Sequence, residues 1–239
     1  MKHPSLSSPM SIYLFALKYL FGMPESGLGK YRADTSGPLA KPNSKSQIRS
    51  EDRLDFMIHH GFLRSWTGPY LIPTTQRFAN LLDSSIRNTC LSEDWVEIPD
   101  FSDFIKQVVG RCFIQTLFGP ALLHRHPKFV EDMWKFDDAI PWLAWGIPSW
   151  IMPKAHSLRS KLHRQLQDWY TYARQNFTED GVDSHGDGDP IWGSWLMRYR
   201  QDVLSKGGSH DDASLAAADL GLIWAYVQEL HFQGQTLED

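Results

Sequence analysis

The chain has 239 residues, of which 42% are hydrophobic, 13% aromatic and 22% charged, and its formal net charge is −4. Ten Trp, thirteen Phe and eight Tyr are too many aromatic side chains to stay solvated, so the composition excludes a disordered chain. The mild acidity argues against a nucleic-acid-binding protein, which normally carries a basic surface.

The longest apolar stretch near the start, residues 12–23, is too short to span a bilayer and contains Lys18. No small-residue cleavage site follows it, so the sequence predicts a cytoplasmic chain without a transmembrane segment. The two cysteines, Cys90 and Cys112, provide neither a disulfide framework nor a Cys-x-x-Cys pair for a metal.

Helical periodicity dominates the chain. Residues 26–50 are rich in Gly, Pro, Ser and Lys and are predicted to form a loop. From Phe101 to Leu117 apolar residues recur every three or four positions, which predicts a helix that Asp100 or Ser102 caps and that Gly119-Pro120 ends.

A second strong helix is predicted over residues 155–177, followed by a Gly- and Asp-rich loop over residues 178–190. Ser209 and Asp212 resemble a capping box ahead of residues 213–225, which are apolar nearly all round and are typical of a buried helix. Only Trp95–Pro99 alternates like a strand, so the predicted fold class is mostly α.

Three tryptophans, Trp142, Trp145 and Trp150, lie among prolines in one short stretch. Two interpretations stay open for it. The stretch is either a rigid corner of the core, or an apolar opening that admits lipophilic ligands or contacts a membrane.

No motif for phosphate binding, nucleotide binding or nucleophilic catalysis is present. His59-His60 lacks the spacing of a helical metal site, and a solvated or hydrogen-bonded role is the simpler interpretation. Asp183, Asp187 and Asp189 alternate with glycines but lack the Glu of a calcium loop, so a solvated turn is expected. From the residues alone, no metal site is predicted.

Four segments, in this order, carry a resemblance to a known family: residues 62–78 (FLRSWTGPYLIPTTQRF), 100–123, 136–155 and 216–225 (AAADLGLIWA). Together they are similar to the middle portion of a cytochrome P450, specifically the fungal members of the class that contains the sterol 7α-hydroxylases and prostacyclin synthase. The resemblance covers about residues 20–225 and leaves 226–239 as a divergent tail. It implies a single helical domain over residues 1–239, with regions that resemble helices B to I but without most of the β-sheet.

The sequence departs from the family where the chemistry is done. The family binds haem b through a Cys thiolate in a Phe-x-x-Gly loop, and neither Cys90 nor Cys112 has that context. No Glu is followed three residues later by Arg, and Ala225 is followed by YVQELHFQGQTLED instead of an oxygen-activating Thr turn. The resemblance therefore implies a chain that is truncated relative to the family, expected to bind no haem and to have no catalytic residues for monooxygenation on its own.

Three functions remain open. The first is a truncated cytochrome P450-like protein of fungal oxidative or secondary-metabolite biosynthesis. The second is a protein that binds an apolar small molecule or pairs with a full-length homologue. The third is a fragment of an active haem-thiolate monooxygenase whose gene has been misread, with the tail after Ala225 translated from an intron.

The resemblance also suggests site residues. Asp219, Leu222 and Ile223 lie where substrate and haem would meet, and whichever of His59 and His60 faces inward is a candidate partner of a haem propionate. Without the rest of the enzyme, the helix over residues 213–225 is expected to keep an uncovered apolar face that includes Leu220, Leu222, Ile223 and Trp224. Low stability, or a partner that covers this face, would follow.

Overall fold

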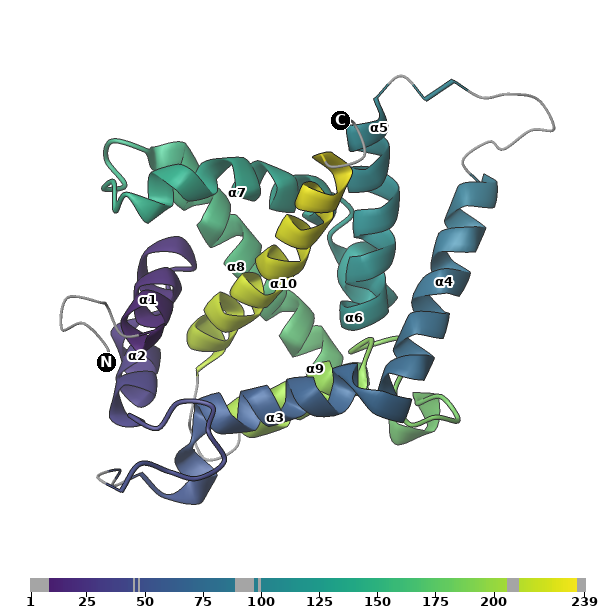
Figure 1. Cartoon of the computed structure of the whole chain (residues 1–239). Coiled ribbons are helices and arrows are strands. Elements are labelled where there is room, and N and C mark those ends of the chain that lie inside the picture. Colours follow the sequence, from purple (N-terminus) through teal and green to yellow (C-terminus); the bar gives the residue numbers. More distant parts are fainter. Residues whose placement is uncertain are drawn as a thin grey trace.

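A computed structural model of the chain describes residues 9–44, 46, 48–88, 97–98, 100–205 and 211–235. Throughout these ranges the regular structure is helical (Figure 1). The α-helices are α1 (Pro9–Phe15), α2 (Glu25–Ala33), α3 (Leu54–Trp66), α4 (Leu71–Asn88), α5 (Phe101–Phe104), α6 (Gly110–Arg125), α7 (Phe129–Ala144), α8 (Pro153–Asn176), α9 (Trp195–Ser205) and α10 (Asp212–Gln235). Two π-helical turns (Ala16–Leu20 and Ile105–Val109) and three 3₁₀ turns (Ser50–Asp52, Gly68–Tyr70 and Glu179–Gly181) complete the regular elements. The mostly α fold class is confirmed for the described ranges.

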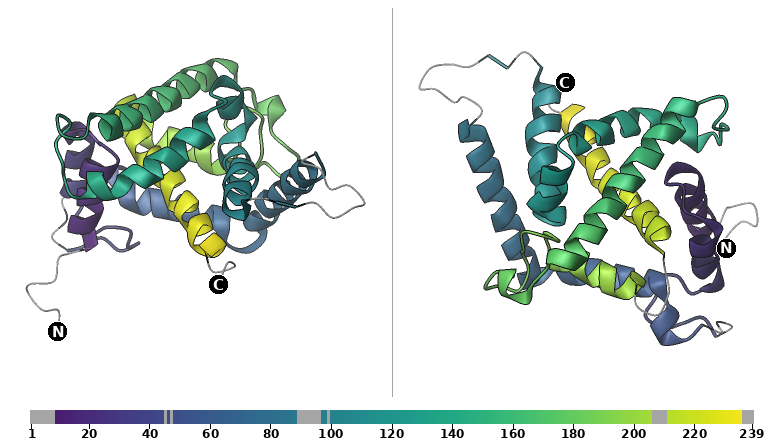
Figure 2. Two further views of the ribbon diagram at one scale, coloured as in Figure 1. Left: turned by 90° about the horizontal axis from the view of Figure 1, so that it is seen from above. Right: turned by 180° about the vertical axis from the view of Figure 1, so that it is seen from behind.

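Helix α10 lies at the centre of the arrangement. Its first turn is capped by Asp211, whose Oδ1 accepts the backbone N–H of Ser214 at 2.7 Å. Helix α10 crosses α8, which covers it from behind (Figure 2), and also contacts α6, α7 and α9. This placement explains why the sequence of α10 is apolar on nearly every side.

The core is formed where α8 crosses its neighbours. Leu162, Leu166, Trp169 and Tyr170 of α8 are fully buried, and they belong to one hydrophobic cluster that includes residues of α6, α7, α9 and α10. The periodicity that predicted a helix over residues 155–177 therefore reflects a buried stripe, and the observed bounds differ by one or two residues.

The segment after Asp100 is helical as predicted, and two local features behave as expected. The Oδ1 atom of Asp100 accepts the backbone N–H of Asp103 at 2.8 Å, which confirms the N-cap. Gly119 has φ 77° and ψ 164°, so the α-helical backbone is broken before Pro120 and resumes after it. The helix of residues 101–117 thus ends where the Gly-Pro pair predicted.

The predicted loop over residues 26–50 was wrong for its first part, because α2 occupies Glu25–Ala33. Leu28 and Tyr31 of this helix are almost completely buried. Their packing outweighs the low helix propensity of the glycines beside them. After the helix, the buried Arg53 side chain donates hydrogen bonds to Asp34 and to the backbone carbonyl oxygens of Leu39 and Ala40. These bonds fix the conformation of the loop.

The prediction of an uncovered face on α10 was wrong for Leu220 and Ile223, which are 0% and 1% exposed. They pack against the neighbouring helices of the chain itself. Leu222 and Trp224 are half-buried, and the indole N–H of Trp224 donates to Asp137 Oδ1 of α7 at 2.8 Å. In the part of α10 whose side chains the structure describes, residues 212–226, the chain itself therefore covers much of the helix.

The tryptophan-rich stretch is not a core corner. Trp142 lies near the end of α7, and Trp145 and Trp150 lie in the turn that follows. Trp145 and Trp150 are 79% and 80% exposed, and Ile151 beside them is also exposed. The alternative of an apolar surface feature therefore remains.

Several predictions fall on residues outside the described ranges: the Ser209 cap, Cys90, all but Glu97 and Ile98 of the predicted strand, and the end of the tail. Within the described ranges, no helix combines the length and apolar character that crossing a bilayer requires.

Candidate apolar site along helix α10

One face of α10 borders two cavities. Ala218, Gly221, Leu222 and Ala225 follow each other in steps of three, one and three residues, so they share one face of the helix. They line a cavity of about 240 Å³. The opposite walls come from α1, the π turn after it, α2, α3 and α9, through Tyr13, Leu17, Phe21, Tyr31, Ile58, Phe62 and Arg200.

The second cavity borders α10 at Tyr226, the residue after Ala225, and measures about 330 Å³. Its lining is almost entirely apolar, apart from three threonines. The lining residues are Trp66, Leu71, Thr74, Thr75, Phe78, Phe113, Thr116, Leu117 and Tyr226. Helices α3, α4, α6 and α10 therefore converge on it.

A row of aromatic rings in contact links the lining of the first cavity to that of the second. Phe62 and Trp66 of α3 form a T-shaped pair with ring centroids 5.8 Å apart. Trp66 then contacts Tyr226 of α10 at 4.7 Å, and Tyr226 contacts Phe113 of α6 at 4.9 Å. Such rings offer apolar and polarisable surface to a ligand with few rotatable bonds to immobilise.

The first cavity has one charged group in its wall, Arg200. Its Nε and Nη2 atoms both donate to Asp219 Oδ1, at 2.9 and 2.5 Å, and the hydroxyl of Tyr170 donates to Asp219 Oδ2 at 2.7 Å. Burial acts to lower the pKa of Arg200, but the carboxylate of Asp219 outweighs it and raises that pKa. Burial also raises the pKa of Tyr13, another residue that lines this cavity, to about 12. The cavity thus presents neutral phenols and a neutralised ion pair.

Of the three predicted pocket residues on α10, Leu222 lines the first cavity. Asp219 and Ile223 are buried on the core side of the helix and line neither of the two cavities. Asp219 serves as the buried partner of Arg200 and Tyr170. Contact with a substrate therefore stays a prediction, with structural support from Leu222 only.

Both predicted histidines lie on α3 and are exposed. The ring of His60 stacks on Phe56 of the same helix, with centroids 6.1 Å apart. Neither ring lines the cavities of α10. The structure thus brings neither histidine to this site.

The sequence reasoning missed Arg200 and the aromatic row. A signal for Arg200 was present: it lies in the stripe of Leu196, Met197 and Leu204, which are all buried. An arginine inside one apolar stripe and an aspartate, Asp219, inside another indicate a buried ion pair. The ring contacts of Trp66 and Tyr226 had no comparable local signal.

The acidic loop before α9 is occupied by internal contacts. Asp183 accepts backbone N–H groups of His185, Asp187 and Gly188. Burial acts to raise the pKa of Asp183, but these donors outweigh it and lower that pKa. No group of three metal-binding side chains occurs within the described ranges.

Comparison with known proteins identifies the family that this arrangement resembles. The chain is 27% identical over 184 residues to the cytochrome P450 monooxygenase efuG of Hormonema carpetanum, which covers 76% of this chain and 33% of that protein. It is 30% identical over 132 residues to the cytochrome P450 monooxygenase fsoE of Humicola fuscoatra (55% of this chain, 23% of that protein). It is 25% identical over 194 residues to the 25-hydroxycholesterol 7-alpha-hydroxylase of Rattus norvegicus (78% and 42%). This chain resembles part of a cytochrome P450.

The cytochrome P450-like chain spans between about a quarter and two fifths of the length of these relatives. No protein-family model matches it, and no solved structure gives a significant match. The resemblance stated from the sequence, to fungal enzymes and to sterol 7α-hydroxylases, is confirmed by these relatives.

The described residues do not fit a thiolate-bound haem. Cys112, on α6, is 2% exposed, and its Sγ lies 3.2 Å from Ser85 Oγ of α4, within hydrogen-bonding distance. It lines neither cavity of α10, so its sulfur is not exposed to a group bound there. These side chains therefore support no step of the family's oxidative chemistry.

Proposed function

We propose that these 239 residues form the part of a cytochrome P450-like protein that binds an apolar small molecule, in fungal oxidative or secondary-metabolite biosynthesis, and that they do not carry out monooxygenation by themselves. The observation that carries the first half is the pair of cavities along α10. The fungal relatives support the biological setting.

The two cavities suit a rigid, mostly apolar ligand. Their walls are aromatic and aliphatic, and the charge in the wall, on Arg200, is bound by Asp219. A ligand without charge would leave this pair intact, whereas a charged ligand would compete with it at a high desolvation cost. Because the name of the rat relative specifies 25-hydroxycholesterol, this sterol is the first probe that we would test.

The second half of the proposal, that the chain does not carry out monooxygenation by itself, rests on where its two cysteines lie. A monooxygenase of this family needs a thiolate on the haem iron, because the thiolate donates the electron density that favours O–O cleavage. Cys112 is buried beside Ser85 and lines neither cavity, and Cys90 lacks the sequence context of a haem ligand.

Binding is tested with radiolabelled 25-hydroxycholesterol in equilibrium dialysis. Thr75→Trp places a large ring at the mouth of the second cavity and is expected to weaken binding at least tenfold. Gln76→Trp is the matched control, because Gln76 is the exposed next residue of α4 and does not line the cavity. No saturable binding to the unaltered chain, or equal loss in both variants, would contradict an apolar site on α10.

Absorption spectroscopy tests whether the chain can bind haem through a cysteine thiolate, which monooxygenation requires. The purified chain is mixed with haem, reduced and exposed to carbon monoxide. We expect the spectrum to lack the red-shifted Soret band of thiolate-bound iron. The appearance of that band in a stoichiometric complex would overturn this half of the proposal while leaving the binding result unaffected.

A further inference from the structure

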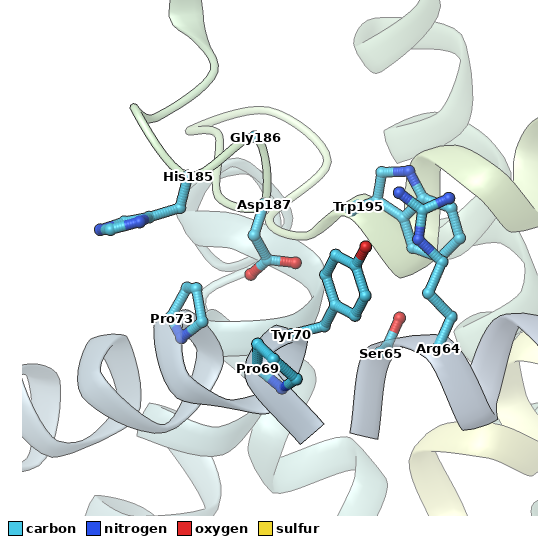
Figure 3. Close-up of a pocket in the computed structure, with 9 residues that line it drawn as sticks. All are labelled: Arg64, Ser65, Pro69, Tyr70, Pro73, His185, Gly186, Asp187 and Trp195. Atoms are coloured by element: carbon cyan, nitrogen blue, oxygen red, sulfur yellow. The ribbon is translucent and has the colours of Figure 1, made fainter. Parts of the chain in front are cut away.

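A separate pocket of about 240 Å³ lies where α3 meets α4, facing the loop that leads into α9 (Figure 3). It is lined by Arg64 and Ser65 of α3, by Pro69 and Tyr70 of the turn that follows, by Asp187 of the acidic loop and by Trp195 of α9, among others. It shares no lining residue with the two cavities of α10. It is therefore a different site from the apolar one along α10.

The pocket contains a cation without an acidic partner. The guanidinium of Arg64 lies 4.0 Å from the ring centroid of Trp195 and 5.2 Å from that of Tyr70. Trp195 in turn stacks on Tyr199, with centroids 4.8 Å apart, so Arg64 caps a three-membered stack. Within the part of the chain that the structure describes, no carboxylate forms an ion pair with Arg64. The stack holds the flat face of the guanidinium and leaves its N–H edge available to a ligand.

Beside this cation lies a buried hydroxyl group that has no hydrogen-bond partner. Ser65 is only 5% exposed, and its Oγ is buried and unpartnered. In Figure 3 this hydroxyl points toward the space between Tyr70 and Arg64. A buried hydroxyl without a partner is costly in a folded protein, and a ligand that accepts its hydrogen would remove that cost.

The opposite wall is fixed by hydrogen bonds and ion pairs of its own. Asp187 Oδ2 accepts hydrogen bonds from Arg77 at 2.7 Å and from Thr74 at 3.1 Å, both on α4. The loop that carries Asp187 is further fixed by the three backbone N–H groups that Asp183 accepts. Arg77 pairs with Asp187 and also lies 3.6 Å from Asp183 Oδ2, so the carboxylates of this wall already have a cation. Among the described residues that line the pocket, Arg64 is the charged group without such a partner.

We propose that this pocket binds a small organic carboxylate. The carboxylate would accept hydrogen bonds from the guanidinium of Arg64 and from Ser65 Oγ, and its apolar body would pack on Tyr70 and Pro69. One water molecule takes up about 30 Å³ in the liquid, so the pocket has the volume of about eight water molecules. This volume suits a ligand with a single ring and one carboxylate. The preformed walls keep the cost of ordering on binding low.

Benzoate is the probe, and benzamide is its neutral counterpart of the same shape. In calorimetric titrations of the full chain at pH 7.5, we expect saturable binding of benzoate with a dissociation constant on the order of 1 mM. Benzamide is expected to bind at least tenfold more weakly, because it cannot form the charge-assisted hydrogen bonds. Absence of saturable benzoate binding, or equal binding of the two compounds, would overturn the proposal.

Variants separate binding from folding. Arg64→Gln is expected to weaken benzoate binding about tenfold or more, whereas Arg111→Gln, at an exposed arginine of α6, leaves it unchanged. Ser65→Ala removes a hydroxyl that has no partner in the free protein, so the melting temperature should stay equal or rise while binding weakens severalfold. If Ser65→Ala lowered the melting temperature and left binding unchanged, the hydroxyl would have a structural role and the proposal would fail.

Discussion

Gly193, in the loop before α9, and Gly119, at the break in α6, meet backbone against backbone. A Cβ atom on Gly193 would lie far inside van der Waals contact with the backbone N of Gly119. Both residues also have positive φ angles, 86° and 77°, which favour glycine over any residue with a side chain. The break after the first part of α6 is therefore held in place by a loop 74 residues further along the chain.

Gly193→Ala is expected to destabilise the protein by about 2–5 kcal/mol, because a left-handed conformation and a backbone clash are both penalised. Urea unfolding followed by circular dichroism measures the change. Gly29→Ala is the control: a Cβ there meets no atom within 4 Å, and the helical position should gain about 0.5–1 kcal/mol. Equal stability of Gly193→Ala and the unaltered chain would contradict this contact.

The buried pair of Arg200 and Asp219 leads to a second prediction. Asp219→Asn leaves the guanidinium buried without its counter-charge and should cost about 3–5 kcal/mol in the free energy of unfolding. Asp168→Asn, which breaks the exposed pair with Arg125, should cost about 1 kcal/mol or less. The double variant Arg200→Met/Asp219→Leu should recover part of the first loss, since no buried charge remains. If Asp219→Asn and Asp168→Asn lowered the free energy of unfolding by similar amounts, the buried ion pair would not be the cause of the loss.

His163 of α8 makes stability depend on pH. Burial, assisted by the nearby charge of Arg159, lowers the pKa of His163 to about 4, and its Nε2 is buried without a partner. In the unfolded chain the imidazole has its ordinary pKa of about 6.5. Between pH 6.5 and 4 the unfolded chain therefore binds a proton that the folded chain does not, so stability is full above this window and falls as the pH falls through it.

The measurement is the free energy of unfolding in urea at pH 7.5 and pH 4.5, for the unaltered chain and for His163→Leu. The variant should lose less stability on acidification, with a difference of roughly 2–3 kcal/mol. Parallel losses in the two proteins would mean that His163 does not titrate on unfolding.

The exposed tryptophans lead to a fourth prediction. Trp145 and Trp150, with Ile151, form an apolar surface patch that water solvates poorly, and tryptophan rings favour the interface between lipid and water. The chain should therefore sediment with phosphatidylcholine vesicles, and Trp145→Ser/Trp150→Ser should reduce the bound fraction severalfold. Leu39→Ser, at an exposed residue elsewhere, is the control. No difference between the two variants would exclude the patch as the contact.

Some features were predictable because their causes are local. The Asp100 cap and the break at Gly119 depend on residues adjacent in sequence, and α8 shows its buried stripe directly in its spacing. Helix α2 was missed because its glycines disfavour a helix, whereas the burial of Leu28 and Tyr31 in the core, which stabilises it, depends on the tertiary structure.

The candidate site was less predictable than the fold. Leu222 was found from the resemblance, and the structure places it in a cavity wall. Arg200, Trp66 and Tyr226 were missed, since their contacts join α9, α3 and α10 across long stretches of chain. The pocket of Arg64 and Ser65 depends in the same way on a loop more than a hundred residues away.

The sequence by itself determined the mostly α class, the helices over residues 101–117, 155–177 and 213–225, and the cytochrome P450 resemblance, because propensity, capping and apolar spacing act between near neighbours. Only the tertiary structure decided which side of α10 is covered, which faces a cavity and which charges are paired. Burial and Coulomb interactions depend on distances in space, and residues far apart along the chain set those distances.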